Sequence, residues 1–313
     1  MTTIAINKSY RVVISLTTVP DKYPKLEATL KSLHAQTYKV DAIYLSLPKK
    51  MRRLPLEYPP LPTEVAKLCT VVPVTDFGPI TKILGGLLAE KDAETVIITV
   101  DDDMIYPPKM VEALMKHHTV YPDSALGSAG MLLKYPCPMC AITPNEDNAL
   151  YRISKFHVPL EGRRVDSIYG YAGALYVRKF FPSNDKLEEE FLKPALINTD
   201  TLMNDDIMIS GYISTRGIER RIFPNMPNVG FVLKGGTRER VETEISYSLD
   251  KFFQRMNAAI LKAKEIGMYS VTEPMDVSET IIGVAAIAVL SILVLIILLI
   301  YIFWKNALPI PML

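Results

Sequence analysis

The first hundred residues alternate between short apolar runs and an amphipathic pattern. Apolar positions recur at helical spacing between residues 23 and 36, at Leu26, Leu30 and Leu33. The β-branched and apolar runs that predict buried strands are 11–16, 41–47, 69–74 and 96–100. Strands that alternate with helices favour a parallel sheet joined by right-handed crossovers. The sequence therefore predicts an α/β fold whose first half is of the nucleotide-binding type.

The middle of the chain continues with both kinds of pattern. Further strands are expected at 125–133, 166–177 and 229–233, and further helices at 64–67, 81–90, 109–118, 183–191, 207–216 and after Ser248. The segment 135–163 is long, irregular and rich in proline. Loops of that length in a compact domain are usually functional or disordered, so this one is expected to cover an acceptor site.

The last hydrophobic segment differs from the others, because residues 281–304 contain no charged side chain. At about 1.5 Å of rise per residue, it can cross a hydrocarbon core of roughly 30 Å. The expected organisation is a catalytic domain at 1–270, a linker at 271–280, a transmembrane helix at 281–304 and a tail at 305–313. The polar start of the chain does not read as a signal peptide. A membrane protein with a C-terminal anchor and a cytosolic domain is therefore expected, although Lys305 favours the opposite orientation.

Composition narrows the possibilities further. The 35 Lys and Arg residues balance 34 Asp and Glu residues, which gives no reason to expect a nucleic-acid partner. The chain has three cysteines, and Cys137 and Cys140 form a C-x-x-C motif without the second pair that a zinc site would need. These cysteines are expected to be packing residues in a reducing compartment.

Three consecutive carboxylates, Asp101, Asp102 and Asp103, follow the strand at 96–100. In open α/β sheets, ligands bind just beyond the carboxyl ends of strands. Asp101 and Asp103 have the D-x-D spacing that suits one hard divalent cation, Mg²⁺ or Mn²⁺, which takes oxygen ligands. The alternative is a solvated acidic turn that caps the next helix.

Three other segments carry candidate chemistry. Lys82 opens a helix after the Gly78-Pro79 turn, where its positive charge interacts unfavourably with the helix dipole. The same position would suit a diphosphate bound at that end of the helix. The alternative is a solvated surface lysine. The Asn204-Asp205-Asp206 run precedes the helix at 207–216, where acidic residues complement the dipole and a general base could also lie. Tyr169 and Tyr171 stand among glycines and form either a platform for a sugar ring or part of a core strand.

In this order the segments resemble glycosyltransferases of the GT-A fold, and are most similar to the inverting, family-2-like enzymes. The resemblance covers roughly residues 11–233 and is carried by 14–20, 76–82, 101–103 and 204–207. It implies a nucleotide-diphospho-sugar transferase fold, a mostly parallel sheet flanked by helices, followed here by the expected transmembrane helix. The Gln-x-x-Arg-Trp motif of processive synthases is absent from the sequence.

The resemblance also implies a donor site for a nucleotide-sugar. Thr17 and the loop after the first strand would lie near the nucleotide. Asp76 would face its base or ribose, and Lys82 the same nucleotide. Asp101 and its neighbour Asp102 would contact the donor.

The same resemblance implies a metal and a base. Asp101 and Asp103 would hold Mn²⁺ or Mg²⁺ on the diphosphate, and Asp206 or Asp205 would be the general base of a single inverting displacement. The family pair is often Glu-Asp, so Asp-Asp leaves the choice of base open. The acceptor could be a glycan, a lipid or a protein.

Two other classes remain open from the sequence. A D-x-D phosphohydrolase also has carboxylates after a strand, but Ile105 stands where such enzymes have Thr or Val, and the motif follows the fourth strand rather than the first. The other is a catalytically inactive, membrane-anchored binding protein of the same fold.

Overall fold

A computed structural model describes residues 10–53, 56–133, 151–152, 162–223, 230–231 and 249–269. The chain divides into one unit at Met1–Val271 and a second at Thr272–Leu313. The expected transmembrane helix at 281–304, Cys137 and Cys140, and most of the segment 135–163 lie outside the described residues. Within the described ranges, no helix has both the length and the apolar character that crossing a membrane requires.

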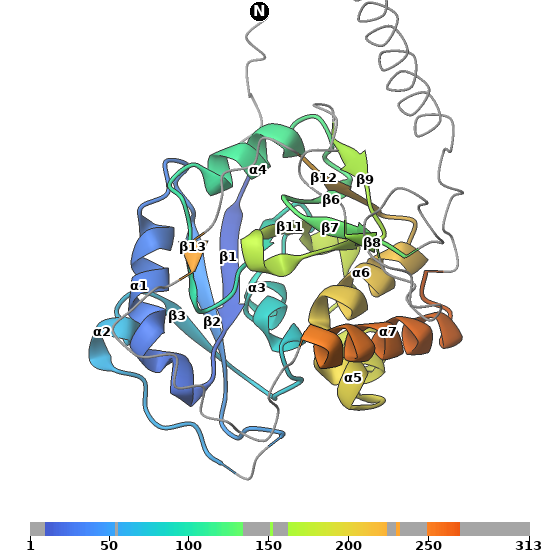
Figure 1. Ribbon diagram of the computed structural model, residues 1–313. Coiled ribbons are helices and arrows are strands. Elements are labelled where there is room, and N and C mark those ends of the chain that lie inside the picture. The colour runs from blue at the N-terminus through green and yellow to red at the C-terminus, as the bar shows by residue number, and fades with distance from the viewer. Residues whose placement is uncertain are drawn as a thin grey trace, which may run out of the picture. The chain divides into compact units, whose positions relative to one another are not determined.

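The described fold is built on a mixed, mostly parallel sheet of eight strands in the order β3-β2-β1-β4-β11-β6-β12-β9 (Figure 1). Pairings within β3-β2-β1-β4 and between β6 and β12 are parallel, whereas β11 and β9 run antiparallel to their neighbours. The strands are β1 (Val12–Thr17), β2 (Ala42–Pro48), β3 (Thr70–Val74), β4 (Val96–Thr99), β6 (Ser124–Gly127), β9 (Arg163–Arg164), β11 (Ala174–Val177) and β12 (Glu219–Ile222). The predicted α/β class is confirmed.

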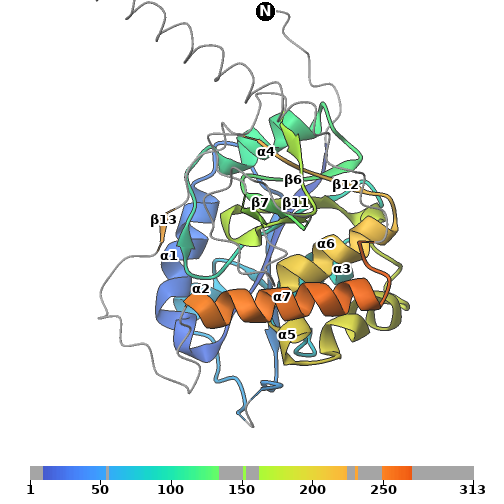
Figure 2. The same cartoon turned by 45° about the vertical axis from the view of Figure 1, so that its right-hand side comes forward.

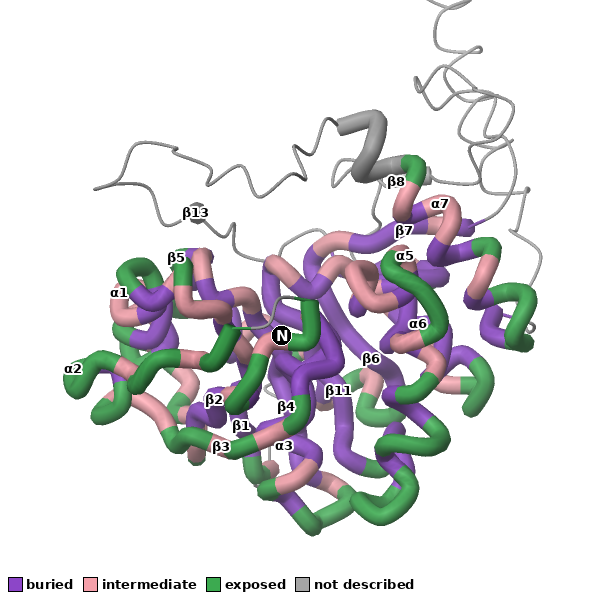
Figure 3. Tube along the Cα trace, turned by 90° about the horizontal axis from the view of Figure 1, so that it is seen from below, coloured by how far each residue is buried: buried purple, intermediate pink, exposed green. Residues whose placement is uncertain are grey.

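Helices cover both faces of this sheet. One face carries α1 (Tyr23–His34), α2 (Thr63–Ala66) and α4 (Met110–His118), and the other carries α3 (Leu84–Ala89), α6 (Asp205–Thr215) and α7 (Leu249–Glu265). Strand alternation produces the two layers, because Val12 and Ile14 of β1 pack toward α1 and Val13 packs toward the opposite helices. Figure 2 shows α7 lying across α6 and α5 (Thr199–Leu202). Figure 3 shows the central strands buried between the layers.

The remaining elements are short. They comprise the 3-10 turns η1 (Pro20–Lys22), η2 (Ile80–Ile83), η4 (Gly170–Ala172), η5 (Arg178–Phe180) and η7 (Lys193–Leu196), the π-helix η6 (Leu187–Leu192), and the strands β5 (Met104–Ile105), β7 (Gly130–Leu132), β8 (Tyr151–Arg152), β10 (Ser167–Ile168) and β13 (Gly230–Phe231).

Two predicted strands are each divided in the structure. The run 125–133 forms β6 and β7, and β7 pairs in a separate sheet of order β10-β7-β8. The run 166–177 forms β10, η4 and β11, because Gly173 has a φ of +88° that extended backbone does not permit. The helix expected at 183–191 is found as the π-helix η6, shifted toward its C-terminus.

The topology brings three segments to one edge of the sheet. The carboxyl ends of β1 to β4 share that edge because the four strands are parallel. Ala174, the first residue of the antiparallel β11, pairs with Thr99 at the end of β4, so the Gly170–Gly173 turn lies beside the aspartate triplet. The helix α6 leads into β12, which is parallel to β6, so the amino end of α6 points to the same edge.

Candidate functional site

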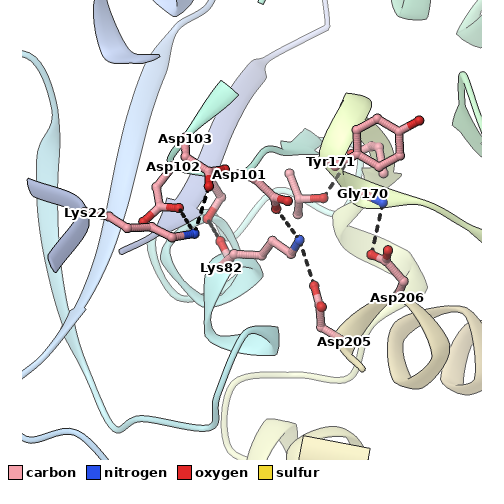
Figure 4. A network of polar contacts seen from close by, with 12 residues as sticks. Lys22, Lys82, Asp101, Asp102, Asp103, Gly170, Tyr171, Asp205 and Asp206 are labelled. Carbon is pink, nitrogen blue, oxygen red and sulfur yellow. Dashed lines mark hydrogen bonds and ion pairs between the residues drawn. The ribbon is translucent and has the colours of Figure 1, made fainter. Parts of the chain in front are cut away.

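Lys82 is at the centre of the polar residues at this edge (Figure 4). Its Nζ lies 2.7 Å from Oδ1 of Asp101 and 2.7 Å from Oδ2 of Asp205, and its side chain is only 7% exposed. Burial lowers the pKa of Lys82, but the carboxylates of Asp101, Asp205 and Asp206 outweigh burial and hold that pKa well above its usual value. Lys82 is therefore a buried, charged link between the end of β4 and the start of α6.

The backbone of Lys82 is held as well. Ser15 of β1 donates its hydroxyl to the carbonyl of Lys82 at 2.6 Å, and Gly86 donates its N–H to the same hydroxyl at 3.0 Å. The sequence placed Lys82 at the start of a helix, and the structure places it in η2, one turn before α3. The alternative of a solvated surface lysine is wrong.

The three aspartates after β4 have different surroundings. Asp102 is buried with a side chain 8% exposed, whereas Asp101 and Asp103 are 33% and 30% exposed. Nζ of Lys22 lies 3.0 Å from Oδ1 of Asp102 and 3.2 Å from Oδ2 of Asp103. Burial raises the pKa of Asp102 by more than Lys22 lowers it. For Asp101, Lys82 outweighs burial and lowers the pKa.

The two aspartates of α6 also differ. Asp205 is buried against Lys82, while Asp206 is half-buried and accepts the backbone N–H of Gly170 at 3.0 Å through Oδ1. Burial, followed by repulsion from Asp205, raises the pKa of Asp206 well above its usual value. A Cβ on Gly170 would lie 2.8 Å from Oδ1 of Asp206 and 3.1 Å from Nζ of Lys82, so only glycine fits here without displacing them.

Tyr106 is a site residue that the sequence reading missed. Its hydroxyl accepts the N–H of Asp101 at 2.8 Å and donates to the carbonyl of Tyr171 at 3.0 Å, and the residue is 2% exposed. It thereby joins the aspartate triplet to the turn that holds Asp206. The sequence reading also missed Lys22, because nothing in the local sequence pattern marks a lysine whose partners lie 80 residues away.

Thr17 and Asp76 make contacts within the loops at this edge. The Thr17 hydroxyl donates to the carbonyl of Ser46 at 2.8 Å. Oδ2 of Asp76 accepts the N–H of Arg52, and Oδ1 accepts the N–H of Gly78, each at 2.7 Å. Beside Asp76 is a cavity of about 640 Å³, lined by residues that follow β2, by β3 and the loop after it, and by α3 and η6. Of the predicted site residues, only Asp76 lines this cavity.

The carboxylates can be tested for their fit to a divalent cation. Among the described residues, the ion pairs that these carboxylates make are with the ammonium groups of Lys22 and Lys82. Within the described part of the chain, no three His, Cys, Asp or Glu side chains are grouped to hold a metal. Mg²⁺ commonly takes only one or two carboxylates and completes its shell with phosphate and water. Asp101 and Asp103, which are partly exposed, are carboxylates of the kind that such a cation takes.

No family pattern and no curated protein matches this chain. Among solved structures, the chain is similar to S. aureus TarS residues 1–349, at 9% identity and a TM-score of 0.43, over 71% of this chain and 60% of that one. It is similar at the same identity and TM-score to the complex of that protein with UDP, over 70% and 59%. The chain thus spans about 60% of the length of these structures. A likeness at this level identifies neither the activity nor the substrate of this chain.

Proposed function

We propose that this protein is a glycosyltransferase that moves a sugar from a nucleoside diphosphate sugar to an acceptor hydroxyl. The observation that carries the proposal is the Lys82 bridge, which joins Asp101 after β4 to Asp205 at the start of α6. Two acidic motifs about 100 residues apart are thus joined at the carboxyl edge of the sheet. One motif is suited to the donor diphosphate and the other to the acceptor.

In this proposal the donor binds over Asp101, Asp102 and Asp103, and its diphosphate is recognised with Mn²⁺ or Mg²⁺ at Asp101 and Asp103. When bound, the cation would neutralise charge that develops on the leaving diphosphate. Asp76 and Thr17, in the neighbouring loops, are proposed to contact the nucleotide. Asp76 would then exchange one backbone N–H partner for a donor on the base or ribose.

We assign the general base to Asp206 rather than Asp205. Asp205 is buried and paired with Lys82, which makes it a poor proton acceptor for an incoming hydroxyl. Asp206 is half-buried, and burial and the neighbouring Asp205 raise its pKa, which makes its carboxylate a stronger proton acceptor. Asp206 would remove the acceptor proton while the oxygen attacks the anomeric carbon opposite the leaving group, which inverts that carbon.

The test of this assignment is Asp206→Asn. The amide oxygen can still accept the Gly170 N–H, so the fold and donor binding should survive while transfer falls by about 10²-fold or more. Transfer is measured with a panel of nucleotide-sugars and acceptors in the presence of Mn²⁺, and donor binding by calorimetry. Asp92→Asn, at an exposed aspartate that precedes the amino end of β4 at the opposite edge of the sheet, is the matched control. Full activity of Asp206→Asn would refute the assignment.

The phosphohydrolase alternative is less compatible with the geometry. Such an enzyme uses the first aspartate of the motif as a nucleophile, whereas Oδ1 of Asp101 is paired with Lys82. Release of phosphate from a phosphomonoester without an acceptor would favour that alternative. Absence of donor binding and of transfer with every nucleotide-sugar would favour the inactive binding protein.

A further inference from the structure

Tyr269, near the end of the described chain, has an unusual backbone conformation. Its φ is +58°, and it is the one non-glycine residue with positive φ among those that the structure describes. For a bulky residue the left-handed region is disfavoured and persists only when the surroundings impose it. Tyr269 is 3% exposed, so the surrounding protein holds it on every side.

The chain before Tyr269 shows how this conformation arises. After α7, Gly267 adopts a φ of +86°, and Met268 donates its N–H to the carbonyl of Ala263 at 2.9 Å. This is a glycine-based helix end of the Schellman type, which reverses the chain direction. The reversal directs Met268 and Tyr269 onto α6.

Tyr269 then lies along one face of α6. Its backbone N–H donates to Oγ of Ser214 at 3.0 Å, and its hydroxyl donates to the carbonyl of Ile207 at 2.5 Å. Between these two contacts, a Cβ on Gly211 would lie 3.0 Å from Cε2 of Tyr269 and 2.8 Å from Sδ of Met268. Ile207, Gly211 and Ser214 recur at the spacing of one helical face, and the glycine lets the tyrosine approach.

The hydroxyl end of Tyr269 contacts the turn that carries the proposed base. Ile207 directly follows Asp206, and Ser167 of β10 donates its hydroxyl to the carbonyl of Asp206 at 3.0 Å. The first turn of α6 is therefore held by both β10 and Tyr269, and the side chains of Ser167 and Tyr269 also hydrogen-bond to each other. Burial raises the pKa of Tyr269, so its hydroxyl keeps the proton that it donates.

We propose that Tyr269 is a positioning residue, whose hydroxyl fixes the first turn of α6 so that the Asp206 carboxylate faces the acceptor. The proposal rests on the assignment of Asp206 as base. The family resemblance ends at about residue 233, so this proposal adds the segment after α7 to the residues that serve the proposed activity. A base must be held close to its productive geometry by neighbours that are themselves fixed, and a small displacement lowers the rate.

The test is Tyr269→Phe, which keeps the ring and removes only the hydroxyl. The matched control is Tyr44→Phe, which also removes a buried hydroxyl. The Tyr44 hydroxyl donates to Glu90 at 2.7 Å, a contact outside the group of charged residues around Lys82. We expect kcat for transfer to fall about tenfold in Tyr269→Phe while the Kd of the donor stays unchanged, and the control to keep wild-type kcat. Both variants should lower Tm, because each loses buried hydrogen bonding.

A second readout does not depend on activity. Hydrogen exchange of a peptide that spans residues 204–212 should be faster in Tyr269→Phe than in the wild type and in Tyr44→Phe. Unchanged exchange would overturn the proposal, and so would faster exchange with an unchanged kcat. If the wild-type protein transfers no sugar, the proposed function fails, whereas the exchange comparison still decides whether Tyr269 holds the turn.

Discussion

Lys82 shows at the scale of one residue how the site depends on charge balance. Because its ammonium is the buried partner of both Asp101 and Asp205, Lys82→Met would leave two carboxylates without their cation. Breaking a buried pair in this way costs about 3–5 kcal/mol. We expect a large loss of unfolding free energy at neutral pH, measured by urea denaturation. The exposed Lys31, which pairs with Glu27 on α1, supplies a control, and Lys31→Met should cost far less.

The loss in Lys82→Met should also depend on pH. The folded state lowers the pKa of Asp101, so the stability that this group contributes is present above its unfolded pKa and disappears as the pH falls through the folded value. The stability difference between wild type and Lys82→Met should therefore shrink below about pH 4. A difference that stays constant from pH 7 to pH 3 would mean that the lysine stabilises the fold through packing alone.

At the scale of elements, the turn η4 places Asp206 beside the end of β4. Gly170→Ala would put a Cβ 2.8 Å from Oδ1 of Asp206 without requiring a new backbone conformation, since the φ of Gly170 is not positive. We expect transfer to fall by about one to two orders of magnitude, because the carboxylate must move, while Tm changes by only a few degrees. Parallel measurement of kcat and of a melting curve separates the two effects. An active variant would show that the Gly170–Asp206 contact is not needed.

The same elements show what the sequence could and could not predict. The strands β1 to β4 and the helix α1 follow from local apolar periodicity, and so does the position of the aspartate triplet at a strand end. The contacts that complete the site are not local. Lys22 reaches Asp102 across 80 residues and Tyr106 reaches Tyr171 across 65, so only the folded topology reveals them. The strand β12, with alternating burial but three charged residues, lacks the apolar run that marked the other strands.

At the scale of the whole molecule, the described core is contained in the unit Met1–Val271. A chain ending at Val271 should therefore unfold with the same Tm as the full chain and keep donor binding. Because residues 281–304 carry no charge, the full chain should sediment with membranes after alkaline carbonate washing and the shortened chain should not. Release of both forms by carbonate would argue against a transmembrane segment at 281–304.

The charges around Lys22 and Lys82 at the carboxyl edge of the sheet predict linked binding of cation and diphosphate. Lys22 and Lys82 already offset part of the charge of the carboxylates, so a divalent ion alone gains little there. A nucleoside diphosphate alone would meet repulsion from the same carboxylates, whereas the two together neutralise each other and the site. We expect Mn²⁺ or UDP alone to raise Tm slightly. The two together, at one hundred times Kd, should add about 2.7 kcal/mol to the free energy of unfolding, a gain that EDTA removes. Equal stabilisation by UDP with and without EDTA would show that the two lysines, not a metal, supply the positive charge at the diphosphate.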